Sequence, residues 1–392
     1  MSSNDASTKL NRVLFIGPYP PPYSGPEMGM KLFLESSLQE KYSISFLCTN
    51  VRKSNKNKGR FGLAMVFAFA RFFSILLWKL VTVRPKVVYY PITATQIGWV
   101  GRDAPCLMLC RLFGAKTIIH LRASHFRLNY QQFRPLLQKL VRFALGLVNT
   151  VIVQSDQLHS QFQGLVAPER IKTLYQAIES DEYDNVDVLN YVRGKILFVG
   201  HQTQAKGFCD LVRAIEPVVA KVPEADFYFA GTMRRGERNV FYNQITGEKL
   251  NYEDPFDVQQ EILDSDTASH YHNLGIVHGE EKLETLRSID LFVLPSYSEG
   301  FSRAVVEAMC MGKPVVYTPV GAHQEALSEE QGARVMPGDH DALVNAITQL
   351  LTDRDRRDAI AKRNYRFVRE NFDIEVIASQ FADIINAAIS RS

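Results

Sequence analysis

The sequence has few cysteines and none in a pairing pattern. Its five cysteines stand at scattered positions without a CxxC spacing, which argues against a disulfide framework and against a structural zinc site. Two nucleotide-binding motifs are also missing, because neither GxGxxG nor GxxxxGK[ST] occurs. A standard NAD fingerprint and a Walker P-loop are therefore excluded.

Excess charge is missing too. The formal net charge is only +3, which is too small to indicate a nucleic-acid partner, so any anion recognition must be local. The N-terminal stretch MSSNDASTKLNR has no apolar signal core, and we therefore expect a cytoplasmic protein.

Length and periodicity predict two α/β domains. The chain of 392 residues, 46% of them hydrophobic, has enough apolar material for more than one core. Short β-like runs alternate with helical stretches, which predicts parallel sheets covered on both faces. After the acidic stretch DEYDNVDVLNYVRG the pattern restarts at KILFVG. We predict an N-terminal domain at 1–188, a C-terminal domain at 189–370, and a last helix at 371–392 that packs back on the first domain.

One apolar segment allows two interpretations. Residues 61–80, FGLAMVFAFARFFSILLWKL, follow the basic run RKSNKNKGR and carry Arg71 near their middle. A charge there disfavours a membrane span. The segment is either a buried helix of an α/β domain or a helix lying in a membrane interface, as a peripheral contact.

Ligands of doubly wound sheets bind beyond the carboxyl ends of the strands, so the loops there are informative. The first loop, PYPPPYSGPEMGM, places Gly25 before a helix, where a phosphate can approach the backbone. The second places Lys206 before Gly207, and this lysine is either a phosphate ligand or a solvated side chain. The third gathers four basic or titratable side chains, which indicates an anion or proton-transfer site: His120, Arg122, His125 and Arg127.

The fourth loop, in EGFSRAVVE, places two carboxylates eight positions apart. The pattern predicts a strand, a turn, and a helix from about Ser302 to Met311, with Glu299 before the helix and Glu307 on its second turn. Carboxylates only accept hydrogen bonds, so vicinal hydroxyls of a sugar or ribose suit them. The free amides at the start of the helix suit phosphate oxygens. One turn thus offers what a nucleotide sugar requires.

These residues resemble a known family. SEGFSRAVVEAMCMGKPVVYTPVGAHQEAL is similar to the E-x7-E donor-binding signature of retaining GT-B glycosyltransferases, most of all glycosyltransferase family four, and PYPPPYSGP matches that family's N-terminal PP-x-x-G loop. The resemblance covers nearly the whole chain. It implies the GT-B fold, in which two Rossmann-like, doubly wound domains face a central cleft. It also implies transfer from a UDP- or GDP-linked sugar with retention of configuration, without a metal or another cofactor.

The resemblance also implies roles for single residues. Glu307 would hold the nucleotide ribose, Glu299 would contact the donor sugar, and Lys206 would bind the diphosphate. His120 matches the family's active-site histidine, so His120 and Glu299 are the catalytic candidates. The remaining donor-site candidates are Gly25, His201, Gly300, Phe301 and Ser302, and the acceptor-site candidates are Arg122 and His125.

The chain departs from the family pattern beside Lys206. Where the family has Gly-Arg-Leu, this sequence has Gly200, His201 and Gln202, so a second fixed positive charge on the diphosphate is missing. His201 replaces it only when protonated, which predicts donor binding that weakens as the pH rises.

The expected function is a hexosyl-transferring glycosyltransferase of polysaccharide or glycolipid biosynthesis at the cytoplasmic face of a membrane, with a glycan or a lipid-linked acceptor. Two alternatives stay open: a sugar-nucleotide epimerase or hydrolase on the same fold, and an inactive donor-binding homologue that organises a membrane complex. Sugar altered without an acceptor would indicate the former, and binding without transfer the latter.

Overall fold

The computed structural model describes residues 10–21, 25–50, 63–184, 187–235 and 242–390. The basic run at 52–60, the first two residues of the predicted helix 61–80, and part of the PYPPPYSGP loop lie outside these ranges. The chain divides into two compact units. Unit 1 comprises Met1–Val153, His159–Leu174 and Ile374–Ser392, and unit 2 comprises Gln154–Leu158 and Tyr175–Asp373.

Unit 1 is built on a parallel sheet of six strands in the order β2-β1-β3-β4-β5-β6. Apolar, β-branched and aromatic runs form these strands, and most of their side chains are buried. The strands are β1 Asn11–Gly17, β2 Tyr42–Cys48, β3 Val87–Ile92, β4 Lys116–Leu121, β5 Thr150–Val153 and β6 Ile171–Thr173. The helices are α1 Gly25–Glu35, α2 Leu38–Lys41, α3 Leu63–Thr82, α4 Gln96–Gly98, α5 Ala104–Leu112, α6 Phe126–Gln131, α7 Pro135–Gly146 and α16 Ile374–Ser390.

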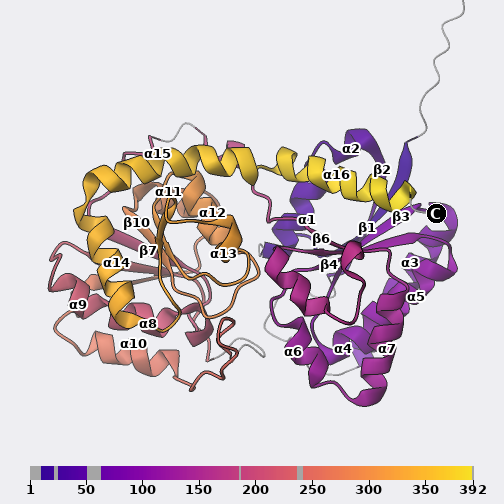
Figure 1. Cartoon of the computed structure of the whole chain (residues 1–392), viewed down its shortest axis with the longest axis horizontal. Coiled ribbons are helices and arrows are strands. Elements are labelled where there is room, and N and C mark those ends of the chain that lie inside the picture. The colour runs from indigo at the N-terminus through magenta and orange to yellow at the C-terminus, as the bar shows by residue number, and fades with distance from the viewer. Residues whose placement is uncertain (1–9, 22–24, 51–62, 185–186, 236–241, 391–392) are drawn as a thin grey trace, which may run out of the picture. The chain divides into compact units, whose positions relative to one another are not determined.

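The C-terminal helix α16 belongs to unit 1, against whose elements Figure 1 shows it in yellow. Phe381 of this helix packs against Tyr89 and Phe33, with ring centroids 4.9 Å away in both cases. The hydroxyl of Tyr42 donates to Asn386 Oδ1 at 2.8 Å. The helix therefore completes the core of the sheet that precedes it in the chain by more than two hundred residues.

Unit 2 repeats the architecture, with a six-stranded parallel sheet in the order β12-β11-β10-β7-β8-β9. Its strands are β7 Lys195–Val199, β8 Asp226–Ala230, β9 Tyr271–Gly275, β10 Leu291–Leu294, β11 Val315–Tyr317 and β12 Gly332–Arg334. Its helices are α8 Phe208–Arg213, α9 Ile215–Val219, α10 Pro255–Leu263, α11 Gly279–Ser288, α12 Arg303–Cys310, α13 His323–Ala326, α14 His340–Thr352 and α15 Arg354–Asn371. Two six-stranded parallel sheets with helices confirm the predicted α/β class.

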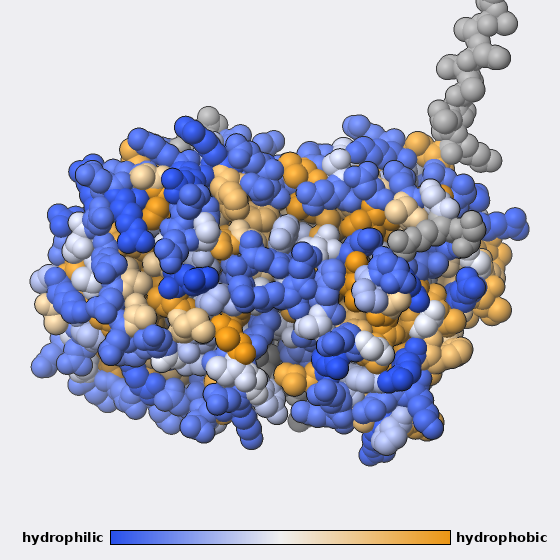
Figure 2. Space-filling view, viewed as in Figure 1, coloured by the Kyte–Doolittle hydropathy of each residue, from blue (hydrophilic) through white to orange (hydrophobic). Residues whose placement is uncertain are grey.

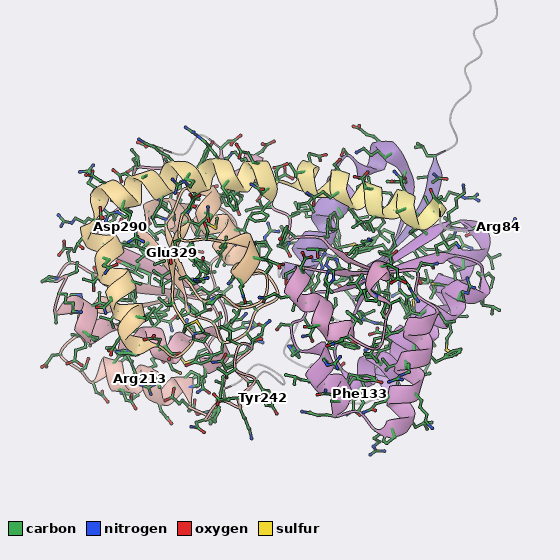
Figure 3. The ribbon with its side chains drawn as sticks, viewed as in Figure 1. Arg84, Phe133, Arg213, Tyr242, Asp290 and Glu329 are labelled. Carbon is green, nitrogen blue, oxygen red and sulfur yellow. The ribbon has the colours of Figure 1, made fainter. Side chains whose placement is uncertain are left out.

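Two local features of unit 2 bear on the loops around the site. The helical stretch after β7 is divided into α8 and α9, because Pro217 lacks an amide hydrogen and its ring crowds the carbonyl four residues earlier. The polar segment before β9 forms an antiparallel bridge between Tyr242 and Lys249, followed by α10. Asp290, labelled in Figure 3, pairs with Arg357 of α15 at 2.7 Å.

Helix α3 is neither wholly buried nor a membrane span. Among the described residues, no helix combines the length and the apolar character needed to cross a bilayer. One face of α3 packs on unit 1 through Phe72, Leu76 and Leu80, whereas Phe67 and Trp78 on the other face are 73% and 61% exposed. The structure thus leaves large apolar side chains of this helix in solvent.

Candidate functional site

The EGFSRAVVE stretch follows a strand and forms the turn and the helix that the sequence predicts. Strand β10 ends at Leu294, Ser302 is the extended residue before α12, and Gly312 follows the helix with a φ of 72°. Both carboxylates of the stretch are buried, Glu299 at 7% and Glu307 at 2% exposure. A buried carboxylate needs a partner, so the surroundings of each one decide what it can do.

Glu299 forms an ion pair with Lys206, which comes from a loop 93 positions earlier in the sequence. The lysine Nζ lies 2.7 Å from both carboxylate oxygens. Ser296 donates to Glu299 Oε1 at 2.7 Å, and the Glu299 amide donates to Gln244 Oε1 at 3.0 Å. The structure therefore brings together the lysine that was predicted to bind the donor diphosphate and the carboxylate that was predicted to contact the donor sugar.

Two glycines allow the loops around this ion pair to approach each other. Gly207 has a φ of 72°, and a Cβ atom there would lie 2.1 Å from the Pro295 carbonyl oxygen. Gly321 has a φ of 56°, and its Cβ would lie 2.3 Å from the carbonyl oxygen of Glu299 and 2.4 Å from that of Gly300. Both positions require glycine for conformation and for space.

The Ser302 amide is already used within unit 2. It donates to His323 Nε2 at 3.3 Å, while His323 Nδ1 lies 3.3 Å from the Thr318 carbonyl oxygen. Burial lowers the pKa of His323 below its ordinary value, so the neutral ring accepts at Nε2 and donates at Nδ1. The expectation that this amide is free for a phosphate must be corrected: a ligand would compete with His323 for it.

Glu307 lies between two cations, Lys282 at the start of α11 and Arg303 one turn earlier on α12. Arg303 Nε lies 2.9 Å from Glu307 Oε1, and Lys282 Nζ contacts Oε2. Burial raises the pKa of Glu307, but the two cations outweigh burial and the pKa is lowered from its ordinary value. Sequence reasoning missed both cations. The spacing of Arg303 and Glu307 on one helix was a readable signal, whereas nothing in the sequence indicates Lys282.

Gln202 and His201 stand where the family pattern differs, directly after β7. Gln202 is fully buried, and its amide donates to the Gly231 carbonyl and to Asn273 Oδ1, both at 3.1 Å. It therefore fixes the loop to β8 and β9. His201 is partly exposed in the same loop, on the stretch that leads to Lys206.

In unit 1, the structure brings together three predicted residues, His120 and Arg122 at the carboxyl end of β4 and Gly25 at the start of α1. His120 is 2% exposed, and its Nδ1 lies 2.8 Å from the Tyr89 hydroxyl. Arg122 Nη1 lies 3.5 Å from the Gly25 carbonyl oxygen at the start of α1. Burial, assisted by the charge of Arg122, lowers the pKa of His120 well below its ordinary value, so this imidazole is neutral. Sequence reasoning missed Tyr89, which lies on β3, the strand next to that of His120.

The other two basic residues of that loop have different surroundings. His125 lies directly before α6 and is partly buried. Arg127 is held by the neighbouring loop, since its Nη1 donates to the Gln163 carbonyl at 2.6 Å. That contact gives Arg127 a structural role.

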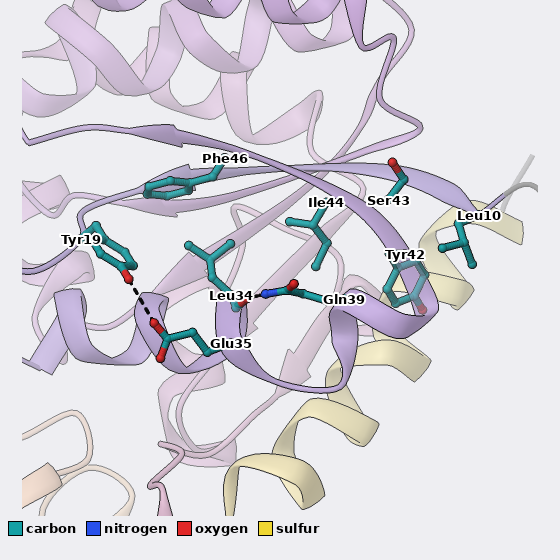
Figure 4. A pocket seen from close by; sticks show the side chains of 9 residues that line it. All are labelled: Leu10, Tyr19, Leu34, Glu35, Gln39, Tyr42, Ser43, Ile44 and Phe46. Carbon is teal, nitrogen blue, oxygen red and sulfur yellow. Dashed lines mark hydrogen bonds between the residues drawn. The ribbon is translucent and has the colours of Figure 1, made fainter.

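A hollow of about 610 Å³ lies at the edge strand β2 of unit 1 (Figure 4). Tyr19 donates to Glu35 across one end of it at 3.1 Å, and Ile44 and Phe46 of β2 line it. None of the predicted site residues is among its lining, so it is separate from the candidate site.

Parts of the chain are similar in sequence to known proteins. Residues 193–353 match the family model of glycosyl transferases group 1. An uncharacterized glycosyltransferase of Methanocaldococcus jannaschii is 27% identical over 56% of this chain and 55% of its own length. The capsular polysaccharide biosynthesis glycosyltransferase CapM of Staphylococcus aureus is 23% identical over 52% and 48%. The phosphatidyl-myo-inositol mannosyltransferase of Mycolicibacterium smegmatis is 26% identical over 47% and 43%. The chain thus spans about half the length of these curated relatives.

Solved structures resemble nearly the whole chain. The Anabaena protein HepE, crystallised with UDP, has a TM-score of 0.68 at 18% identity, covering 96% of this chain and all of its own. Sucrose-phosphate synthase of Thermosynechococcus elongatus has a TM-score of 0.73 at 16% identity, covering 97% of this chain. At such identities the likeness concerns the fold, which is the predicted GT-B fold. All predicted donor-site residues except Gly25 lie within residues 193–353, the part of the chain that the family model matches.

Proposed function

We propose that the protein is a retaining glycosyltransferase that moves a sugar from a UDP- or GDP-linked donor to a glycan or lipid-linked acceptor. The observation that carries the proposal is the pair of buried carboxylates eight positions apart, Glu299 in the loop before α12 and Glu307 on that helix, with Lys206 bonded to Glu299. The family match of unit 2 supports the reaction class. The CapM and mannosyltransferase relatives support a place in polysaccharide or glycolipid biosynthesis.

The donor would bind unit 2 in the manner of the E-x7-E signature of family four. Glu307 accepts from the ribose hydroxyls and Glu299 from a hydroxyl of the transferred sugar, because ionised carboxylates only accept. Lys206 donates to the diphosphate with the amides of Gly300 and Phe301. Lys206 and Glu299 neutralise each other, and a bound donor would give each of them a partner of its own.

A substitution at Lys206 tests this assignment. Lys206→Met should abolish transfer of labelled sugar and weaken nucleotide-sugar binding, whereas Lys206→Arg should retain part of both. Lys221→Met, in the same unit but bonded to Asn345, is the matched control and should leave both unchanged. Binding is measured by thermal shift with UDP, GDP, ADP and their sugars. If Lys206→Met turns over as fast as the wild type, the assignment is wrong.

The same experiments separate the alternatives. Sugar altered in the absence of any acceptor would favour an epimerase or hydrolase, and donor binding without transfer to any acceptor extract would favour an inactive organiser of a membrane complex. A third measurement concerns His201, which would contact the diphosphate when protonated. A histidine changes charge between about pH 5.5 and 8, so a donor affinity that stays constant over this range would count against that contact.

We also propose a peripheral contact of unit 1 with the cytoplasmic face of a membrane. Residues 41–155 hold 18 lysines and arginines but one acidic residue, the buried Asp103, although the whole chain has 45 basic and 42 acidic residues. Helix α5 packs beside both α3 and α7, and no acidic residue occurs on these three helices. Such a surface complements anionic headgroups.

Exposed apolar side chains lie on the same three helices. Trp78 on α3, Leu112 on α5 and Phe143 on α7 are 61%, 77% and 55% exposed, and Figure 2 shows hydrophobic residues in orange gathered over this part of unit 1. Basic residues beside apolar anchors favour binding at a bilayer surface. Large apolar side chains that gather on a protein surface mark an interaction site, and membrane binding would explain why this face of α3 is exposed.

The two tryptophans make the membrane proposal easy to test. Trp78 is 61% exposed whereas Trp99 is fully buried, so a blue shift of tryptophan emission on adding vesicles reports Trp78. We expect the shift with phosphatidylglycerol vesicles, a loss of it in high salt, and none with phosphatidylcholine. Trp78→Phe is the control and should show no shift. Equal behaviour with both lipids would contradict the electrostatic part, and no binding to either would contradict the contact.

A further inference from the structure

Tyr89 lies against His120 in unit 1, and both side chains are buried. The two residues stand on neighbouring parallel strands, β3 and β4, with 0% and 2% exposure. The tyrosine hydroxyl lies 2.8 Å from His120 Nδ1. The aromatic rings of Phe15, Phe33 and Phe381 surround the tyrosine ring, with centroids 5.2, 6.1 and 4.9 Å away. This packing holds the hydroxyl in place.

The hydrogen of this contact can be assigned from donors and acceptors. Arg122 Nη2 lies 3.4 Å from the Tyr89 oxygen, and a guanidinium only donates. The phenol oxygen thus accepts from Arg122 and directs its own hydrogen to His120 Nδ1. The reverse assignment would leave the phenol hydrogen without an acceptor among the described residues, in a fully buried position. Nδ1 is therefore the accepting nitrogen.

The other nitrogen of the ring must then carry the proton. The imidazole is neutral, because burial and the charge of Arg122 disfavour its protonated form. With Nδ1 unprotonated, the proton of the neutral ring is on Nε2. Nε2 is buried and has no hydrogen-bond partner within the described part of the chain. An unsatisfied buried donor is rare in folded proteins and indicates a group that binds a missing acceptor.

We propose that Tyr89 is a positioning residue that holds His120 in the Nε2–H tautomer, so that Nε2 donates a hydrogen bond to an oxygen of the substrate sugar. The tautomer follows from unit 1 alone, whereas the sugar as acceptor rests on the proposed function. In this state Nε2 cannot take a proton, so His120 acts as a hydrogen-bond donor and not as a general base. Tyr89 acts only through the histidine.

Nitrogen NMR of the full chain with ¹⁵N-labelled histidine tests the tautomer directly. His120→Gln identifies the His120 signals among those of the nine histidines. At neutral pH we expect the wild type to show a protonated Nε2 and an unprotonated Nδ1. Tyr89→Phe, which keeps the packed ring, should shift the population toward Nδ1–H. Tyr42→Phe is the matched control, since it removes a buried hydroxyl of unit 1 that bonds to α16, and should leave the His120 signals unchanged.

The outcomes separate this proposal from the proposed function. A wild-type signal of the Nδ1–H form, or a Tyr89→Phe spectrum identical to the wild type, overturns the role of Tyr89, and the wild-type measurement stands even if the variant fails to fold. In transfer assays, Tyr89→Phe should lower kcat by roughly tenfold to a hundredfold, as expected for losing part of one aligned donor, with the donor KM little changed. A tautomer shift with unchanged kcat would confirm the positioning but overturn a sugar contact from His120.

Discussion

Replacing Glu307 by glutamine should destabilise unit 2, because it leaves two buried cations without their shared partner. Glu307 is 2% exposed and contacts both Lys282 and Arg303. Removing one partner of a buried ion pair costs about 3 to 5 kcal/mol. The glutamine side chain can still accept one hydrogen bond, so the lower part of that range is expected. For a unit of this size, a loss of about 3 to 4 kcal/mol would lower the melting temperature by roughly 6 to 16 °C.

The pH dependence gives the prediction a second readout. The pKa of Glu307 is lowered from its ordinary value of 4.5 in the folded protein. The contribution of ionised Glu307 to the free energy of unfolding is therefore fully present above that ordinary value and is lost as the pH falls through the folded-state pKa. The difference between wild type and Glu307→Gln in the free energy of unfolding should be largest at neutral pH and should shrink as the pH falls below 4.5.

Urea unfolding followed by circular dichroism is the appropriate assay. Both tryptophans, Trp78 and Trp99, lie in unit 1, so their fluorescence does not follow unit 2. Glu280→Gln on α11 is the control, because Glu280 pairs with Arg287 while 67% exposed, and exposed pairs contribute less than about 1 kcal/mol.

A double variant decides whether the buried cations cause the loss. Adding Lys282→Met to Glu307→Gln removes one unpaired cation, and the pair of substitutions should cost less than the sum of the two single ones. Additive losses, or a Glu307→Gln protein as stable as the wild type at neutral pH, would refute the reasoning.

Two further predictions concern unit 2. Burial raises the pKa of Asp210 from 3.8 to about 6 despite the hydrogen bond from Tyr297. The folded state therefore binds the proton more tightly, and the free energy of unfolding falls by about 3 kcal/mol as the pH rises through that window. Asp210→Asn should abolish this loss, and a wild-type free energy of unfolding, measured with urea, that differs from that of the variant by the same amount at every pH would contradict the prediction. Gly321→Ala should lower the free energy of unfolding more than Gly247→Ala does, because both glycines have a positive φ but only Gly321 faces carbonyl oxygens, one of them that of Glu299. Gly321→Ala should also weaken nucleotide-sugar binding in the thermal-shift assay. Equal losses of stability from the two alanines would contradict the prediction and show that the backbone moves to accommodate the methyl group.

Strand β10, the turn after it and the helix in EGFSRAVVE could be predicted because each depends on local signals. The apolar run of β10, Ser302 before the helix and Gly312 after it are contiguous in the chain, and each acts over a few residues. The division of α8 from α9 has a local signal as well, because Pro217 is read directly from the sequence. The predicted roles of Lys206, Glu299 and His120 stay predictions.

The sequence by itself determined the two α/β units and the positions of the residues that carry charge, because hydrophobic periodicity and turn residues act between neighbours in the chain. Tertiary structure alone decided which groups meet. The partner of Glu299 stands 93 positions away, that of His120 stands 31 positions away, and Lys282 reaches Glu307 from a separate helix. Such pairs depend on which strands become neighbours in a sheet. An unpaired charge or hydrogen-bond donor becomes costly only when it is buried, and burial requires that helices cover the sheets.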